Sequence, residues 1–439
     1  MDSGNTAWVL ASSALVLLMT PGLAFFYAGM VRGKNALGML MQNFMTIGIV
    51  SIVWVLASYS IAFGPDGFGG LFGNLHDAGL QHLGGHVSGY TGKTLAQSIP
   101  PVVFVCFQLM FAVITPALFT GSIADRMKFG SFCVIVVAWS LLVYGPVAHW
   151  VFSPNGWAFK WGALDFAGGS VVHMNAGAAG LALALVLGKR VGWPQMQMRP
   201  HNLPFTLLGA GLLWFGWFGF NAGSALGANQ LAGYAFLNTN TATAAAMIGW
   251  VIFEKVVNSK ATTLGAASGA VAGLVAITPC AGYVSPLGSI AVGLMAGAVC
   301  AYACRLKFRF GFDDALDVVG VHLVGGFIGT LSVGLFSTTL INSAGTDGLF
   351  YGGGFTLLGK QFVVAIAVIA YSFSATLLIA LVVRAVMGLR VTRDDETAGL
   401  DTALHAETAY EIGSIAGSGT HGASVPKAVH ETAATGTVA

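Results

Sequence analysis

Two histidines lie inside strongly apolar segments of this chain. His173 occurs in DFAGGSVVHMNAG and His322 in DDALDVVGVHLVGG, and each follows an aspartate. A titratable ring inside a membrane costs several kcal/mol unless it faces a protein-lined cavity or finds a partner. A matched pair of this kind therefore predicts one shared polar site along a permeation path.

Neighbouring imidazoles have a chemistry of their own. Two of them can share a proton through a ring-to-ring hydrogen bond, in which one ring donates and the other accepts. Such a pair would form a polar seam in an apolar lumen, where it could hydrogen-bond a small neutral molecule or pass a proton. The alternative is two separate buried histidines, each bonded to a helix carbonyl. The spacing alone leaves both arrangements open.

A carboxylate and several aromatic rings accompany the histidines. Asp165 opens the segment of His173, where it can cap free backbone N–H groups, stabilise a nearby cation, or do both. Phe107 and Phe111 share one helix face, and aromatic rings can hold a desolvated cation with help from a hydroxyl such as that of Ser224. The alternative for these rings is packing, or a belt at the membrane interface.

Composition places these side chains in a membrane. Of the 439 residues, 56% are hydrophobic and only 8% are charged, against about 25% charged in soluble domains. We therefore predict an all-α polytopic membrane protein. The chain has no phosphate-binding glycine loop, nucleophile elbow or metal-ligand motif, so we expect no enzyme, cofactor, metal or nucleic-acid partner. A metal at His76, His82 and His86, in a glycine-rich loop, is the less favoured alternative.

Apolar runs of about 20 residues mark the expected transmembrane helices. We predict eleven of them, over 8–31, 36–63, 96–122, 129–151, 166–188, 204–224, 237–257, 262–280, 285–304, 316–336 and 359–387. They define one transmembrane domain over 1–388. The polar segment 389–439 is expected to be a cytoplasmic tail, disordered past about residue 412.

The basic residues predict the orientation. With the N-terminus outside, 16 of the 19 Lys and Arg residues fall on the cytoplasmic side, whereas Lys93, Lys160 and Lys360 fall outside. The positive-inside rule therefore favours an outer N-terminus and an inner C-terminus. The two histidines lie in the fifth and tenth helices, and a repeated five-helix unit must enter the membrane upside down. We expect two inverted five-helix repeats plus a final helix, with the shared site near the membrane centre.

Several long motifs carry a resemblance to a known family. They occur in the order PGLAFFYAGMVRGKN, DFAGGSVVHMNAG, RPHNLP, WFGFNAGSA, AITPC, DDALDVVGVH, and finally GLD and HAE. On these motifs the chain resembles the ammonium transporter family (Amt/Mep/Rh), on its bacterial Amt side, from about residue 8 to 411. The resemblance implies a homotrimer in the lipid bilayer of the cell membrane (plasma or inner), with one conduction path for ammonium or ammonia per subunit.

The resemblance also implies roles for single residues. The recruitment site maps onto Phe107, Phe111, Ser224 and Trp217, with Asp165 just below it. The gate maps onto Phe111 and Phe220, and the pore onto the twin histidines His173 and His322 with Gln108 and Thr278. Where the family has an outer tryptophan, this chain aligns Phe152, with Trp157 close by. Phenylalanine is the weaker cation–π surface. The tail carries Ala406 where the family commonly has glycine.

The implied mechanism is recruitment of ammonium outside, loss of its proton near Asp165, and passage of ammonia along the histidines. A bare cation in a narrow apolar pore is very costly, whereas neutral ammonia is not. A PII-type regulator is implied at the cytoplasmic face. Two other classes stay open: an ammonium sensor with little flux, against which the short tail argues, and a neutral-gas channel of Rh type, against which Asp165 and the Phe-rich mouth argue.

Overall fold

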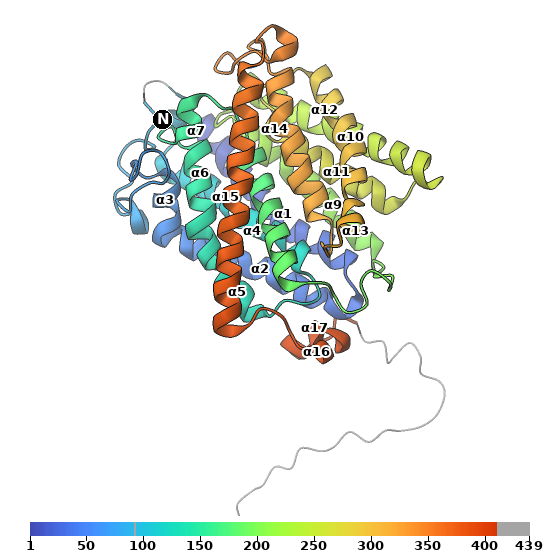
Figure 1. Cartoon of the computed structure of the whole chain (residues 1–439). Coiled ribbons are helices and arrows are strands. Elements are labelled where there is room, and N and C mark those ends of the chain that lie inside the picture. Colours follow the sequence, from blue (N-terminus) through green and yellow to red (C-terminus); the bar gives the residue numbers. More distant parts are fainter. Residues whose placement is uncertain (92–93, 411–439) are drawn as a thin grey trace, which may run out of the picture.

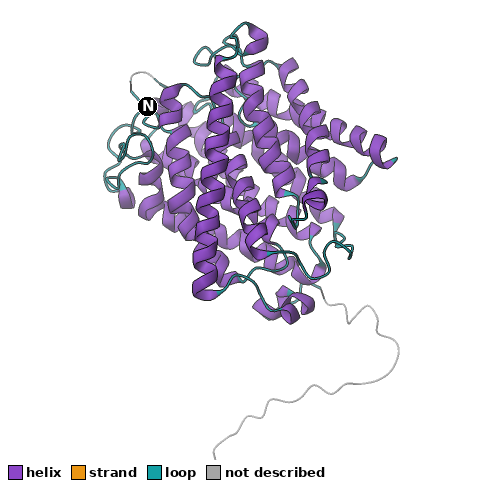
Figure 2. Cartoon of the chain, viewed as in Figure 1, coloured by secondary structure: helices purple, strands orange, loops and turns teal. Residues whose placement is uncertain are grey.

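The protein is a bundle of long helices. The computed structural model describes residues 1–91 and 94–410, and every regular element in these ranges is a helix. Figure 2 shows most of the helices running side by side through the molecule, joined by loops of very different length. The predicted all-helical class is therefore confirmed. The predicted disorder past about residue 412 lies outside the described residues, and the division at 388 stays a prediction.

Most helices are continuous, and a few are interrupted by π-helical turns. The α-helices are α1 (Ser3–Met30), α2 (Ala36–Val53), α3 (Tyr59–Phe63), α4 (Pro101–Ile123), α5 (Phe129–Trp139), α6 (Gly145–Phe152), α7 (Trp157–Trp161), α8 (Asn175–Leu187), α9 (Leu203–Gly223), α10 (Gln230–Asn258), α11 (Thr263–Ile277), α12 (Pro286–Ala303), α13 (Leu306–Phe310), α14 (Val324–Phe336), α15 (Thr356–Met387), α16 (Arg393–Ala398) and α17 (Leu400–His405). The π-helical turns are η2 (Trp54–Ser58), η5 (Ser140–Tyr144), η6 (Gly169–Met174) and η7 (Val319–Leu323).

Length and hydropathy support many membrane crossings. Among the described residues, nine helical stretches are long and apolar enough to cross a membrane. The predicted spans 237–257 and 262–280 correspond to α10 and α11, which are outside that set. Helix α11 is apolar but has only 15 residues, and the 29-residue α10 carries polar side chains such as Asn238 and Thr239. These stretches support a multi-pass membrane protein, whereas the total of eleven spans stays a prediction.

Glycines allow the helices that carry the central residues to pack closely. A Cβ added at Gly209 of α9 would lie 2.2 Å from the backbone nitrogen of Phe26 in α1. A Cβ at Gly297 of α12 would lie 2.2 Å from the carbonyl oxygen of Ala246 in α10. Small residues bring helix backbones together where water supplies no driving force between the helices. The α1–α9 contact holds α9, and with it the central aromatic residues, at a set depth.

The C-terminal segment folds back onto the end of the bundle opposite the N-terminus, where Figure 1 shows α16 and α17. The Asp401 carboxylate accepts hydrogen bonds from the backbone N–H groups of Leu37 at 3.0 Å and Gly38 at 2.7 Å. The Leu400 N–H donates to the Asn35 side chain at 2.8 Å. These contacts satisfy free N–H groups at the start of α2, so the tail serves as the cap of that helix.

Buried ion pairs tie the loops together at the same end. Arg190 donates to both oxygens of Asp313, at 2.8 and 2.9 Å, and Arg126 donates to the Asp313 carbonyl. Arg190 also lies 3.4 Å from Asp125, which is paired with Arg32. Burial alone would raise the pKa of the Asp313 carboxyl, but hydrogen bonds and attraction from Arg190 outweigh burial and leave that pKa below its usual range.

Asp313→Asn is expected to lower the stability of the protein by about 3–5 kcal/mol, because it removes the charge of the carboxylate that accepts two hydrogen bonds from the buried Arg190 guanidinium and leaves that cation only the more distant Asp125. A carboxyl with a depressed folded-state pKa stabilises the fold above its unfolded pKa, and this contribution fades as the pH falls through the folded value. The gap in apparent Tm between wild type and variant should therefore narrow below about pH 4. Thermal unfolding in detergent between pH 7 and pH 3 measures it.

The control is Asp394→Asn, which removes the same charge from an exposed carboxylate at the start of α16. This variant should unfold close to wild type at every pH. An equal loss of stability in both variants, or a gap for Asp313→Asn that stays constant with pH, would show that the Asp313 pair does not supply this stability.

Candidate functional site

The two central histidines face each other inside the bundle. The Nδ1 atoms of His173 and His322 lie 3.3 Å apart and the ring centroids 5.4 Å apart. The two residues are 1% and 2% exposed. Each ring therefore has the other ring, rather than a helix carbonyl, as the partner of its Nδ1. One ring must donate and the other accept, because two protonated nitrogens cannot share this contact.

Both histidines lie in π-helical turns. His173 is the fifth residue of η6 and His322 the fourth residue of η7, and each turn continues directly into an α-helix, α8 or α14. A π-turn widens the helix locally, and such turns are frequent at functional sites. His173 and His322 are 149 positions apart in the chain, and each is brought to the contact by a π-helical turn.

An aspartate precedes each histidine at the same spacing. Asp165 stands eight residues before His173, and Asp314 stands eight residues before His322. Each accepts a hydrogen bond from the N–H of the fifth residue after it, at 2.7 Å for Asp165 and 2.8 Å for Asp314. The equal spacing is already present in the two sequence motifs, although the prediction of a shared site used only the order of aspartate and histidine. The repetition supports two structurally related halves.

Asp165 caps the segment that carries His173. Its carboxylate accepts from the backbone N–H groups of Gly168 at 2.7 Å, Gly169 at 2.8 Å and Ser170 at 2.7 Å. This is the capping role that the sequence analysis considered. Asp165 also lines a pocket at one end of the bundle, so the same group is placed next to any cation that enters there.

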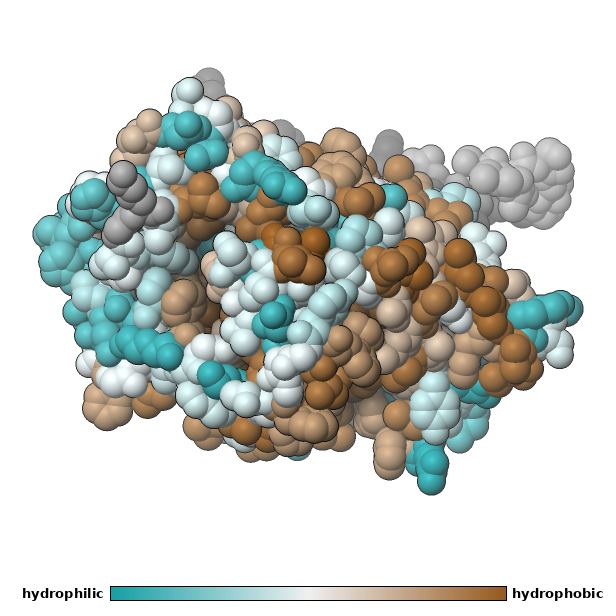
Figure 3. Space-filling model, turned by 90° about the horizontal axis from the view of Figure 1, so that it is seen from above, coloured by the Kyte–Doolittle hydropathy of each residue, from teal (hydrophilic) through white to brown (hydrophobic). Residues whose placement is uncertain are grey.

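That pocket is a vestibule of about 480 Å³. Of the predicted site residues it is lined by Gln108, Phe111, Phe152, Asp165 and Ser224. It opens on the face that carries the N-terminus, because Tyr90 and Leu95 of the loop before α4 also line it and Asp2 is hydrogen-bonded to Ser98 in that loop. Figure 3 shows this face, with hydrophilic residues gathered on the side of α3 and the following loop.

The vestibule also contains residues that the sequence analysis missed. Tyr90, Phe166 and Tyr283 line it and add aromatic surface. Phe166 follows Asp165 directly, which was a signal in the sequence. Tyr283 comes from the turn after α11, more than a hundred residues away, and no sequence pattern pointed to it. Between the two candidates for the outer aromatic position, Phe152 is on the vestibule wall, whereas Trp157 packs against Trp150 at 5.9 Å and is not among the lining residues.

Three predicted positions lie at a different depth from the one expected. Phe107 is fully buried and packs edge-on against Phe111 at 5.0 Å, outside the vestibule wall. Trp217 lies below the vestibule, where its ring stacks on His173 at 5.4 Å and its Nε1 donates to Thr278 at 2.8 Å. Gln108, expected in the pore, lines the vestibule instead.

A pair of stacked rings closes the floor of the vestibule. Phe111 and Phe220 are fully buried, with ring centroids 4.1 Å apart and planes inclined by 23°. Directly beyond them, the His173 ring stacks on Phe220 at 6.2 Å. Vestibule, ring pair and histidines therefore form one column. Phe111 on α4 and Phe220 on α9 meet in that column although the chain separates them by more than a hundred residues.

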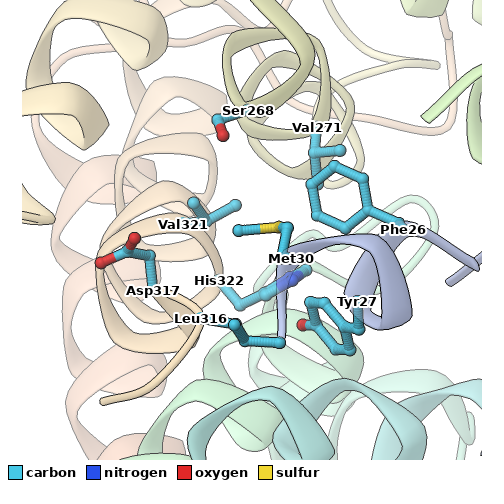
Figure 4. A pocket seen from close by; sticks show the side chains of 9 residues that line it. All are labelled: Phe26, Tyr27, Met30, Ser268, Val271, Leu316, Asp317, Val321 and His322. Atoms are coloured by element: carbon cyan, nitrogen blue, oxygen red, sulfur yellow. The ribbon is translucent and has the colours of Figure 1, made fainter. Parts of the chain in front are cut away.

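A small cavity lies at the far end of the column. It measures about 10 Å³, which is room for about one water molecule. Figure 4 shows the side chains that converge on it: Phe26, Tyr27 and Met30 from α1, Ser268 and Val271 from α11, and Leu316, Asp317, Val321 and His322 from the segment that ends in η7. Asp317 pairs with Lys307 at 2.7 Å. A small, mainly apolar cavity, with Ser268, Asp317 and His322 as polar members of its wall, thus follows the histidines.

Comparison with known proteins identifies the family to which this chain belongs. The model of the Ammonium Transporter Family matches residues 7–410. An ammonium transporter of Mycobacterium tuberculosis is 53% identical, over 95% of this chain and 92% of its own length. The crystal structure of Candida albicans Mep2 superposes with a TM-score of 0.83 at 33% identity, covering 90% of this chain and 88% of Mep2. A structure titled Sensor Amt Protein has the same TM-score at 30% identity, covering 92% and 98%. The chain belongs to the ammonium transporter family.

Proposed function

We propose that this protein carries ammonium across the cell membrane by recruiting the cation, removing its proton and conducting ammonia. The column of vestibule, stacked phenylalanines and paired histidines is the observation that carries the proposal. The names of the relatives support the substrate. Each part of the column suits a different species of the substrate, the cation or neutral ammonia.

The vestibule suits the cation. The rings of Phe111 and Phe152 offer cation–π surfaces, and their centroids lie 6.3 Å apart on the vestibule wall. The Ser224 hydroxyl donates its hydrogen to the Phe220 carbonyl at 2.8 Å, so its lone pairs face away from that bond and can accept from an N–H of ammonium. The Asp165 carboxylate adds negative charge on the same wall.

The stacked phenylalanines exclude the cation. Phe111 and Phe220 place two stacked apolar rings between the vestibule and His173, and such rings cannot replace the hydration shell of an ion. Moving a bare cation through such an apolar constriction is very costly, whereas neutral ammonia loses little. The proton is therefore expected to leave on the vestibule side of the rings, and brief movement of the two rings admits the neutral molecule.

The histidines suit ammonia. The Nε2 atom of His173 is buried and has no hydrogen-bond partner within residues 1–91 and 94–410. Its Nδ1 is committed to His322, so Nε2 is the ring atom left for a substrate. Ammonia can both donate and accept, and it can thus bond to either tautomer of the pair. The bonded histidine pair could also carry the proton that leaves ammonium.

We further propose the family arrangement for the whole protein: eleven spans as two inverted five-helix repeats plus α15, an outer N-terminus, an inner C-terminus and a homotrimer. The repeated aspartate-to-histidine spacing supports the inverted halves. The asymmetry of basic residues supports the orientation. The docked tail, with Asp401 at the start of α2, offers a surface for a PII-type regulator, and nucleotide-sensitive capture of a PII protein would test that partner.

Charge movement tests the proposed function. Proteoliposomes that hold the purified protein are exposed to an ammonium jump, and the current and the internal pH are recorded together. A saturable current that empty liposomes lack means that net positive charge crosses. A rise in internal pH without current means that ammonia alone crosses. If the protein still binds ammonium but gives neither a current nor a pH rise, transport is contradicted and the sensor function is favoured.

A further inference from the structure

The loop between α3 and α4 holds three exposed histidines that the transport column does not use. His76, His82 and His86 surround one pocket of about 200 Å³, and Asp77 also lines it. The loop lies on the face of the vestibule, since its later residues Tyr90 and Leu95 form part of the vestibule wall. Histidine clusters of this kind have one chemistry in common, the binding of transition metals.

The hydrogen bonds of these rings determine which nitrogen is free. The Nδ1 of His76 lies 2.9 Å from the Asp77 carboxylate, that of His82 lies 2.8 Å from the His76 carbonyl, and that of His86 lies 3.0 Å from Oε1 of Gln97. Carboxylate and carbonyl oxygens only accept, so all three Nδ1 atoms must carry the proton. In each neutral ring the lone pair is therefore at Nε2.

The orientation of the Gln97 amide is set independently. Its Nε2 donates to the carbonyl oxygens of Val87 at 3.1 Å and of Tyr90. Its Oε1 must therefore face His86, because exchanging the two atoms would place an oxygen against two carbonyls. The protonation assigned to His86 follows from this orientation.

The spacing of the first two rings suits a shared ion. The ring centroids of His76 and His82 lie 4.8 Å apart, with the planes inclined by 43°. Two imidazoles that bind one ion at about 2.0–2.1 Å, at angles between 90° and tetrahedral, have ring centres roughly 4.5–5 Å apart. The bond from His76 to Asp77 is also the usual carboxylate support behind a metal-binding histidine.

We propose that His76 and His82 form the core of a binding site for a divalent transition-metal ion, of the class of Zn²⁺, Ni²⁺ or Cu²⁺. Within the described ranges, no three His, Cys, Asp or Glu side chains are already placed to hold a metal, so the third imidazole, His86, must move in. Gly84 and Gly85 precede it, and a Cβ at either would meet nothing within 4 Å, which leaves the backbone room for that movement. Imidazole ligands favour these ions over Mg²⁺ or Ca²⁺, which prefer oxygen.

Hydrogen bonds connect this site with the vestibule. His86 is bonded to Gln97, Gln97 to the Tyr90 carbonyl, and the Tyr90 hydroxyl donates to the Phe152 carbonyl at 3.3 Å. Drawing His86 onto the ion breaks the first of these bonds, which is one of the three hydrogen bonds that hold the Gln97 side chain against the vestibule loop. Bound metal is therefore expected to slow transport from this face. That consequence rests on the proposed function, whereas metal binding itself does not.

Calorimetric titration of Zn²⁺ into the purified full chain, freed of any polyhistidine tag, tests the site. We expect one Zn²⁺ per chain, and binding weakened by about ten-fold or more in His76→Gln/His82→Gln, since even loss of a supporting group commonly costs that much. Gln81→Ala, an exposed change beside His82, is the matched control and should bind like wild type. Unchanged binding in the double variant would overturn the proposal.

A spectroscopic measurement covers the case in which the loop rearranges in the variant. Cu²⁺ bound to wild type should show electron-spin coupling to at least two nitrogens, because both core ligands are imidazoles. An ion that shows only oxygen ligation in wild type would also overturn the proposal. Transport that is absent in every protein, with Zn²⁺ binding intact and histidine-dependent, would contradict the proposed function and leave this site standing.

Discussion

His173→Ala is expected to slow ammonium-dependent transport by roughly 5- to 150-fold, because a desolvated ammonia loses a hydrogen-bond partner worth about 1–3 kcal/mol. The change also removes the partner of His322 Nδ1, 3.3 Å away. The hole that remains beside Trp217 exposes the freed Nδ1 of His322, to which water can bond, so selectivity against other cations should fall as well. Initial rates of the ammonium-induced current and of the internal pH change, with and without competing K⁺, measure both effects.

The matched control is His149→Ala. His149 is also fully buried and its Nδ1 is bonded to a carbonyl, that of Ala62 at 3.0 Å, but no cavity of the transport column includes it. The His149→Ala variant should show the wild-type rate and selectivity when transport is normalised to the amount of folded protein. A His173→Ala variant with wild-type rate and selectivity would mean that the paired histidines do not line the conduction path, and the mechanism would have to be abandoned.

Changes at Asp165 are expected to have the second large effect, and two substitutions separate its roles. Asp165→Ala leaves three buried N–H groups without an acceptor, each costing about 1–3 kcal/mol, so this variant should lose both stability and transport. Asp165→Asn keeps an acceptor oxygen and the shape of the side chain but removes the charge. We expect it to fold, with a lower apparent Tm, and to transport far more slowly than wild type.

Thermal unfolding and proteoliposome currents on the same preparations measure these two roles. If Asp165→Asn matches the wild-type rate and affinity for ammonium, the negative charge has no part in recruitment or deprotonation. Asp165 would then be a helix cap alone, which is the structural reading of its three hydrogen bonds. A folded Asp165→Asn protein with little transport would instead show that the negative charge is needed for transport, in addition to the capping hydrogen bonds.

The chemistry of the column could be predicted from the sequence. A histidine inside an apolar segment is costly enough that few explanations survive, so His173 and His322 stand out without any coordinates. Asp165 can be recognised as a helix cap for a similar reason, because a carboxylate just before a glycine-rich helix start can accept from the free backbone N–H groups there. Composition and helix length determine the all-helical membrane class in the same way, since the bilayer leaves few alternatives.

The depth of each side chain was decided by the tertiary structure alone. Trp217 and Gln108 lie on helices α9 and α4 that the sequence placed correctly, yet one faces the histidines and the other the vestibule. Rotation and relative shift of helices depend on close contacts such as that of Gly209 with α1 and on π-turns such as η6, which shift the faces of a helix by a fraction of a turn. Neither is a local property of the sequence.

The same distinction holds for the parts outside the column. Ring-to-ring contact between His76 and His82, and the cap that Asp401 provides for α2, join residues whose spacing in the chain carries no periodic signal. Hydrophobicity is additive along a sequence and can be read from it. Hydrogen bonds are directional and need both partners within about 3 Å, so only the folded chain decides which polar groups meet.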